Sequence, residues 1–241
     1  MKFLIVNDDS IDAPGIALLA EAAAELGDVW VVAPDQQCSA MSQRLTIRET
    51  MTLAQVHDFP VKVQVAYRLG GTPVDCVKVA LELIMPEKPD VVLSGINNGY
   101  NVGFDIAYSG TLGAAFEAVR HGIPAIAFSV AADKYLPCAW QYIQPILKEL
   151  LEMKPERGSV WNVNLPAMKE GTAKGVLYDR VVAPTSMYRE KYIASVQPDG
   201  CAVLTVNGIP TTDEQIPEQT DARAVRDGYI SVGKVKCAVL S

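Results

Sequence analysis

Two adjacent aspartates stand directly after a short apolar run near the start of the chain. The run Lys2–Val6 is followed by Asn7-Asp8-Asp9. Two neighbouring carboxylates repel each other unless a positive charge lies between them, and a divalent cation would supply that charge. Carboxylate oxygens favour Mg²⁺, Mn²⁺ or Ca²⁺ over zinc. The alternative is a solvated loop in which an aspartate caps the following helix.

A second polar stretch, Ser94–Asn101 (SGINNGYN), follows the apolar run DVVL. Asparagine offers either a neutral oxygen ligand or an N–H donor, and glycine lets the backbone approach a ligand closely. The asparagines of this stretch could therefore bind a cation or an anion. An ordinary strand-to-helix turn, which is rich in the same residue types, is the alternative.

A third candidate, Tyr108-Ser109-Gly110-Thr111, stands at the predicted start of a helix. The unpaired N–H groups and the positive dipole at such an end form an anion site. A serine or threonine at this place is, however, most often only a cap. Both interpretations remain open from the sequence.

The polar stretch Gln36–Arg44 (QQCSAMSQR) follows another apolar run, Val29–Ala33, and could cover the same edge of a sheet. Ser39 could contribute a hydroxyl ligand, and Arg44 could contact an anion. A surface loop is the simpler interpretation for both residues.

Histidine and cysteine chemistry is weakly indicated. His57 and His121 have no partner at a spacing typical of zinc or of a catalytic triad, and His121 is expected to bind carbonyl groups at a helix end. The five cysteines are odd in number and widely spaced, with no C-x-x-C pair, so a disulfide framework is not indicated. Unpaired thiols predict a reducing, cytoplasmic location.

The polar stretches lie between apolar runs that alternate between strand and helix patterns. This alternation predicts βαβ units and a mostly parallel sheet. Ligands of such sheets bind beyond the carboxyl ends of the strands, which is where these polar stretches stand. The expected strands are Lys2–Val6, Val29–Ala33, Val61–Tyr67, Asp90–Leu93, Pro124–Val130 and Val160–Leu165, and the expected helices are Pro14–Leu26, Pro73–Met85, Ser109–His121 and Ala139–Met153.

The pattern changes in the last third of the chain, so we expect a core over 1–166 and a β-rich extension over 167–241. A turn at Gln197–Gly200 between the runs Tyr192–Val196 and Cys201–Val206 predicts a hairpin. These apolar strands have no helix of their own to cover them. Their pairing with another subunit is therefore expected.

Composition excludes several classes of protein. The chain has 241 residues, of which 49% are hydrophobic, so it can bury a sizeable core. A net charge of −7 argues against a binder of nucleic-acid polymers, and no apolar run has the length of a membrane helix or a signal peptide. The glycine motifs of dinucleotide dehydrogenases, P-loop NTPases and α/β-hydrolases are absent.

Taken together, the motifs resemble those of the SurE family of survival proteins, the 5′/3′-nucleotidases. The family opens with a strand and N-D-D-G-x-x-A-P-G, and this chain reads N-D-D-S-I-D-A-P-G over Asn7–Gly15. The family motif V-V-A-P-x-x-x-x-S-G-x-x-x-S-L-T resembles Val31–Thr46. The motif G-T-P-x-D-C matches Gly71–Cys76.

Further motifs follow in the same order. S-G-I-N-x-G-x-N matches Ser94–Asn101, and D-x-x-Y-S-G-T matches Asp105–Thr111. Near the end, Thr220-Asp221 and Gly228–Ser231 are similar to T-D and G-Y-V-S. Several motifs in order and at similar spacing make the resemblance specific.

The resemblance implies a divalent metal, Mg²⁺ or Mn²⁺, held by Asp8, Asp9, Ser39 and Asn97. It implies metal-dependent hydrolysis of nucleoside monophosphates and a Rossmann-like three-layer core. It also implies that the C-terminal part exchanges between subunits, which would give a homodimer or a homotetramer. The preferred nucleotide, the 5′ or 3′ position, the cellular metal and any cleavage of polyphosphate stay open.

Within such a reaction, the residues suggest separate roles. Backbone N–H groups at Ser109, Gly110 and Thr111 would hold phosphate oxygens, and Asn101 could donate as well. Asp8 or Asp9 could also orient a water molecule or take its proton, and Asn97 would complete the catalytic set.

Three positions depart from the family pattern. Ser10 and Ala40 stand where the family has glycine, and Arg44 stands where it commonly has serine. A positive φ at Ser10 would be strained.

Two other functions are considered. Signalling receiver domains also bind Mg²⁺ through an acidic pair, but they need a phosphoacceptor aspartate after a central strand, where this chain has S-G-I-N. A nucleotide-binding subunit without catalytic activity is the second alternative, and an assay of turnover would separate it from an enzyme.

Overall fold

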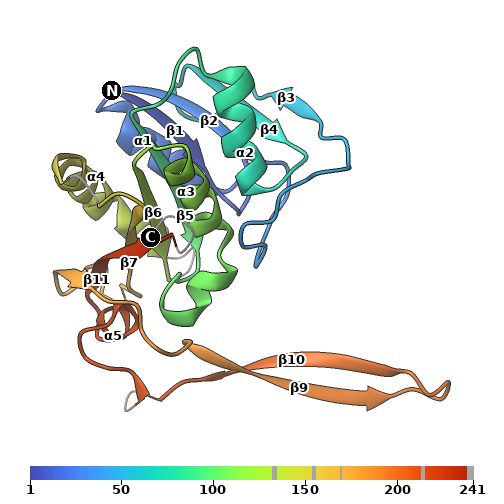
Figure 1. Ribbon diagram of the computed structural model, residues 1–241. Coiled ribbons are helices and arrows are strands. Elements are labelled where there is room, and N and C mark those ends of the chain that lie inside the picture. The colour runs from blue at the N-terminus through green and yellow to red at the C-terminus, as the bar shows by residue number, and fades with distance from the viewer. Residues whose placement is uncertain (132–134, 154–155, 169, 213–214, 238–241) are drawn as a thin grey trace.

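A nine-stranded sheet in the order β3-β4-β2-β1-β5-β6-β7-β11-β8 forms the centre of the protein, and a separate hairpin, β9–β10, projects from it (Figure 1). The computed structural model describes residues 1–131, 135–153, 156–168, 170–212 and 215–237. The strands are β1 (Lys2–Val6), β2 (Asp28–Pro34), β3 (Leu53–Gln55), β4 (Val65–Leu69), β5 (Val91–Asn98), β6 (Ala125–Val130), β7 (Ser159–Leu165), β8 (Val176–Arg180), β9 (Tyr188–Val196), β10 (Ala202–Pro210) and β11 (Ile230–Lys236).

Helices cover both faces of the sheet and make three layers. The α1 and α4 helices pack into one apolar core against one face, whereas α2 and α3 pack into a second core against the other. The predicted α/β fold with a mostly parallel sheet is confirmed. Within the described residues, no helix is both long and apolar enough to cross a membrane. The helical elements are α1 (Pro14–Ala24), α2 (Pro73–Val79), the π-helix η1 (Ala80–Ile84), the 3₁₀-helix η2 (Gly103–Tyr108), α3 (Gly110–Arg120), α4 (Leu136–Glu152) and α5 (Asp221–Arg226).

The strand order reverses beside β1. From β4 to β7 all neighbouring strands are parallel, and β1 lies between β2 on one side and β5 on the other. The chain therefore leaves β1 toward one edge of the sheet and later returns to fill its other side. Such a switch point leaves a crevice at the carboxyl ends of the two central strands.

Two strands differ from their predicted ranges. The sequence placed a strand at Val61–Tyr67, but β4 begins only at Val65. The pairing between β2 and β4 begins at Trp30 and Val65, so the predicted strand residues before Val65 are not part of this ladder. The strand predicted at Asp90–Leu93 continues to Asn98, because β6 runs beside it that far. The stretch expected to be a turn is thus partly strand.

Two helices also differ from their predicted ranges. The helix predicted at Pro73–Met85 continues as a π-helix from Ala80, and α4 starts at Leu136 rather than at Ala139.

The last third of the chain contributes to the sheet as well as to the hairpin. The predicted turn at Gln197–Gly200 joins β9 and β10, which are longer than expected. Two further strands add to the central sheet: β11 pairs antiparallel with β7, and β8 pairs with β11. The short α5 helix was not predicted, since its six residues show no helical period.

Candidate functional site

The candidate site lies at the switch point, where the end of β1 lies beside the second half of β5. Val6, the last residue of β1, pairs with Ser94 in the middle of β5, so the residues after β1 leave the sheet beside the part of β5 that carries Asn97 and Asn98. Asp9 Oδ2 accepts a hydrogen bond of 2.7 Å from the backbone N–H of Asn98. The acidic pair and the asparagines of the second polar stretch therefore belong to one site, as the strand arrangement predicts.

Asp8 is a buried carboxylate with a perturbed pKa. The side chain is 5% exposed, and Oδ1 accepts a hydrogen bond of 2.7 Å from the Thr111 hydroxyl. Burial raises the pKa of Asp8 to about 7; the Thr111 bond opposes this rise and the neighbouring Asp9 charge adds to it. A cation beside the pair would favour the charged form and reverse the shift.

The other two residues predicted to hold a metal are next in sequence to residues that bond to the acidic pair, since Asn97 precedes Asn98 and Ser39 follows Cys38. Asn97 Nδ2 donates to the Gly99 carbonyl, at 2.9 Å, which leaves Oδ1 as the atom of that side chain able to bind a cation. Ser39 is exposed and follows Cys38, whose N–H donates to the Asp8 carbonyl at 2.7 Å. The chemistry of these side chains, all of which offer oxygen atoms, fits a hard divalent ion.

The start of α3 packs directly on Asp8. Gly110 is the first residue of α3, and a Cβ built on it would lie 2.9 Å from Asp8 Cβ. Ser109 Oγ accepts a hydrogen bond of 3.0 Å from the Leu112 N–H, so Ser109 caps the helix. One cap satisfies only one of the four N–H groups of a first turn, and it therefore leaves the anion-binding interpretation open.

Asn101 is fixed within a buried polar network. Its Nδ2 donates to Thr111 Oγ1 at 3.1 Å and to Ser129 Oγ at 2.9 Å. Its backbone is held by two asparagines of β7: Asn164 Oδ1 accepts its N–H at 2.8 Å, and Asn162 Nδ2 donates to its carbonyl at 2.8 Å. Sequence reasoning missed Ser129, Asn162 and Asn164. The signal that could have found them is their polar character within apolar runs predicted to be strands, toward the carboxyl ends of those strands.

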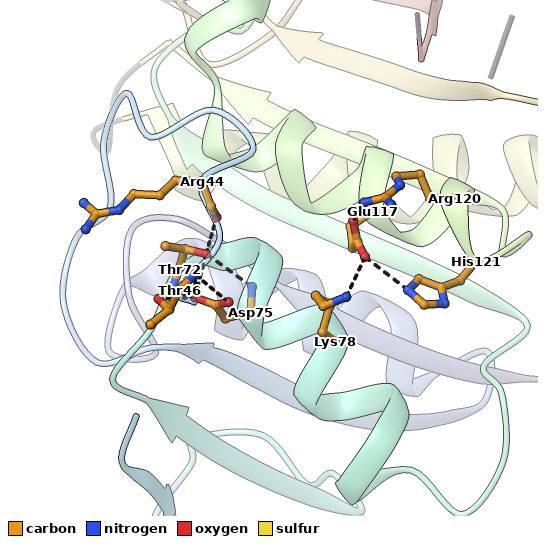
Figure 2. Close-up of polar contacts among 8 residues, drawn as sticks. All are labelled: Arg44, Thr46, Thr72, Asp75, Lys78, Glu117, Arg120 and His121. Carbon is orange, nitrogen blue, oxygen red and sulfur yellow. Dashed lines mark hydrogen bonds and ion pairs between the residues drawn. The ribbon is translucent and has the colours of Figure 1, made fainter. Parts of the chain in front are cut away.

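The loop 36–46 folds over the start of α3 and is anchored by the α2 cap. Ser42 N–H donates to the Tyr108 carbonyl at 2.9 Å. Thr72 Oγ1 donates to the Arg44 carbonyl at 2.6 Å, and the Thr46 hydroxyl donates to Asp75 at 2.7 Å (Figure 2). The motif G-T-P-x-D-C thus has a structural role, because Thr72 and Asp75 form the capping box of α2.

Arg44 lies in a surface loop, which was the simpler interpretation of the sequence. Its side chain is exposed and extends away from the α2 cap, so its backbone makes the anchoring contact (Figure 2). His121 ends α3 as expected, since its N–H donates to the Ala118 carbonyl at 3.0 Å, and its ring contacts the buried Glu117 carboxylate at 3.1 Å. Lys78 and Arg120 pair with the same carboxylate, so this cluster neutralises one buried charge.

Both residues that replace a family glycine adopt a positive φ. The φ angle is 92° at Ser10 and 55° at Ala40. The backbone of this chain therefore keeps a left-handed conformation at both positions without glycine. Such residues carry strain of about 1–3 kcal/mol each and cluster near functional sites.

Asp8 predicts a pH dependence of stability for the metal-free protein. Its pKa rises from 3.8 to about 7 on folding, so the folded state holds the proton more tightly and the free energy of unfolding falls as pH rises between these values. The fall is roughly 4 kcal/mol at most.

The Asp8→Asn variant should lack this fall when the free energy of unfolding is measured by urea denaturation with chelator between pH 4 and 8. Asp58→Asn, which changes an exposed carboxylate, is the control; equal pH slopes in wild type and Asp8→Asn would contradict the prediction.

Comparison with known proteins identifies the family. The model of the family "Survival protein SurE" matches residues 3–194. The chain is 38% identical to a 5′-nucleotidase SurE of Thermoanaerobacter sp. (strain X514), over 96% of this chain and 90% of the relative. It is 39% identical to a 5′-nucleotidase SurE of Flavobacterium psychrophilum, over 97% of this chain and 90% of the relative. The crystal structure of the SurE protein from Aquifex aeolicus superposes with a TM-score of 0.84 at 34% identity, covering 98% of this chain and 93% of that chain. The chain belongs to the SurE family.

Proposed function

We propose that this protein is a 5′-nucleotidase that hydrolyses nucleoside monophosphates to a nucleoside and phosphate with the help of a divalent metal. The observation that carries the proposal is the contact between Asp8 and the first turn of α3. It places the buried carboxylate of the acidic pair against a helix start that can bind phosphate. The names of the relatives support the substrate class.

Asp8, Asp9, Ser39 and Asn97 would hold the metal. These donors suit Mg²⁺ or Mn²⁺, because all four offer oxygen atoms and two are carboxylates. A metal bound there would supply positive charge to the phosphate oxygens and lower the pKa of a bound water. The raised pKa of Asp8 supports this assignment, since burial disfavours its charged form and the neighbouring Asp9 charge adds to the effect, and a cation would oppose both.

The chain's own groups would bind and orient the phosphate. Backbone N–H groups of Gly110 and Thr111 would donate to phosphate oxygens as negative charge develops. The Asn101 amide already donates to Thr111 and Ser129, and the Ser109 N–H donates to the Ile106 carbonyl, so these two residues would shape the phosphate site rather than donate directly as the sequence suggested. The Thr111 hydroxyl donates to Asp8 and accepts from Asn101, so it fixes the carboxylate relative to the phosphate.

Proton transfer completes the proposed reaction. Asp8 or Asp9 would take a proton from the attacking water as its oxygen bonds to phosphorus. The ester P–O bond then breaks, and its oxygen leaves with the nucleoside after taking up a proton, from the protonated aspartate or from solvent water.

We also propose a reducing, cytoplasmic location and assembly of two or four copies. All five cysteines are free, which supports a reducing compartment. Every residue of β9 and β10 is exposed, including Tyr192, Leu204 and Val206. An exposed apolar hairpin supports pairing through the segment 167–241.

Metal dependence tests the proposed function. Release of phosphate from AMP and GMP should stop with chelator and return with Mg²⁺ or Mn²⁺. Asp9→Asn should lower turnover by roughly a hundredfold, because a charged ligand is lost. Asp12→Asn changes an exposed carboxylate of the same loop and should keep wild-type turnover. Full activity in the chelated protein would contradict the proposal, and binding of AMP without any turnover would indicate a binding subunit.

The packing of Gly110 on Asp8 gives a test of phosphate binding. In Gly110→Ala the new Cβ would meet Asp8 Cβ at 2.9 Å and Oδ2 at 3.1 Å, so the carboxylate and the helix start must separate. We expect kcat/KM for AMP to fall about a hundred- to a thousandfold. In the control Gly70→Ala the nearest atom is 3.4 Å away. A folded Gly110→Ala protein with normal kcat/KM would place the phosphate elsewhere.

The hairpin gives a test of assembly. Leu204→Asp combined with Val206→Asp places two charges on one face of β10 and should shift the oligomer to monomer. Asn207→Asp, beside Lys191 in the ladder, adds a charge at a polar position and should not. Sedimentation velocity at micromolar concentration measures the state of each protein. A monomeric wild type would contradict the proposal.

A further inference from the structure

The segment between Asn101 and Thr111 connects the Asn101 amide, which donates to Thr111 and Ser129, to the helix start in the proposed phosphate site. Asn101 precedes η2, and Ser109 follows it with an N–H that donates to the Ile106 carbonyl at 3.2 Å. The conformation of η2 therefore helps to set how the Asn101 amide and the start of α3 face each other. We define this stretch, 101–111, as the phosphate segment.

A carboxylate from the far end of the chain holds the phosphate segment. Asp221 Oδ2 accepts the Gly103 N–H at 3.0 Å. Its Oδ1 accepts the N–H groups of Ala183 at 2.9 Å and of Ala222 at 2.7 Å. Asp221 is 4% exposed, so these three N–H groups would lack partners without it.

The backbone of the phosphate segment comes unusually close to the same C-terminal residues. Gly103 has a φ of +57°, and a Cβ there would lie 2.0 Å from the Thr185 carbonyl oxygen. Phe104 N–H donates to that oxygen at 3.1 Å, and Asp105 Oδ2 accepts the Met187 N–H at 3.2 Å. Met187 directly precedes β9, so the base of the hairpin is bonded to the phosphate segment.

An apolar cluster reinforces this contact. Val102, immediately after Asn101, is fully buried. It packs in a small separate core with residues of the C-terminal part, namely Ala183, Met187, Ile216, Ala222 and Val225. The phosphate segment is thus packed on the C-terminal part through both apolar and polar contacts.

We infer that Asp221 is a positioning residue for phosphate binding, which acts by fixing the backbone of Gly103 and with it the phosphate segment. The inference rests on the proposed function. It assigns to the C-terminal part of the chain a role in substrate affinity, in addition to its place in the sheet. Asp221 does not need to touch the substrate for this role.

Asp221→Asn separates positioning from simple stability. The amide oxygen can keep the bonds to Ala183 and Ala222, whereas the amide nitrogen then faces the Gly103 N–H, donor against donor. We expect KM for AMP and Ki for inorganic phosphate to rise about tenfold, with a smaller change in kcat. The Mn²⁺ concentration for half-maximal activity should stay unchanged, because the Asp221 carboxylate bonds to backbone N–H groups of Gly103, Ala183 and Ala222, which are not part of the proposed metal site.

A purely structural role would have a different signature. A lower folded fraction reduces Vmax but leaves KM and Ki as in wild type. Asp227→Asn, at the exposed end of the same helix, is the matched control and should change neither constant. Asp105→Asn weakens the bond to Met187 and should also raise Ki, so it keeps the test decisive if Asp221→Asn does not fold. KM and Ki within twofold of wild type in the folded variants would overturn the inference.

Hydrogen exchange separates this inference from the proposed function. Amides in peptides covering 101–109 should exchange faster in Asp221→Asn than in wild type, whereas those of β1 should not change. Unchanged exchange over 101–109 would overturn the inference even in an active enzyme. Failure of the wild type to hydrolyse any nucleoside monophosphate would instead overturn the proposed function.

Discussion

The burial of the Asp8 carboxylate against the start of α3 is the constraint around which the rest of the site is built. A desolvated carboxylate is costly unless charge or hydrogen bonds compensate it. The Thr111 hydroxyl compensates only in part, since the pKa of Asp8 still rises to about 7. The same helix start that accommodates Asp8 has N–H groups suited to an anion. A cation on the carboxylate side and a phosphate on the helix side would each offset the charge that the other introduces.

Buried carboxylates outside the site keep this arrangement in place. Asp75 accepts from Thr46 and Thr72, and it thereby fixes the loop that carries Ser39. Asp221 accepts from three backbone N–H groups and holds the segment after Asn101. In both cases a carboxylate accepts hydrogen bonds from loop N–H groups that have no partner in a β-sheet ladder. The loops are irregular because they must reach the ligands, and these side chains replace the missing backbone partners.

The sequence predicted the parts of this structure that depend on local pattern. The strand Lys2–Val6 and the helix from Ser109 lie where their hydrophobic periods and caps indicate. The polar residues after the strand meet the start of the helix, because both lie at the carboxyl ends of the parallel strands. The predicted start of β4 was wrong, because the true start depends on where β2 begins to pair with it. Asn162 and Asn164 were missed, because their contact with Asn101 requires the strand order β5-β6-β7, which no local pattern contains. Contacts of this kind are set by topology.

The turn after the acidic pair illustrates how the surroundings can enforce an unfavourable backbone. Ser10 has a φ of 92°, a region that side chains other than glycine avoid. The Asn7 amide donates to the Ser10 carbonyl at 2.7 Å, and the Ile11 N–H donates to the Pro34 carbonyl at 2.9 Å. The turn is thus bonded on one side to the end of β1 and on the other to the end of β2. Releasing the strain at Ser10 would break these bonds and displace the neighbouring acidic pair, so the geometry of the site holds the serine in its strained conformation.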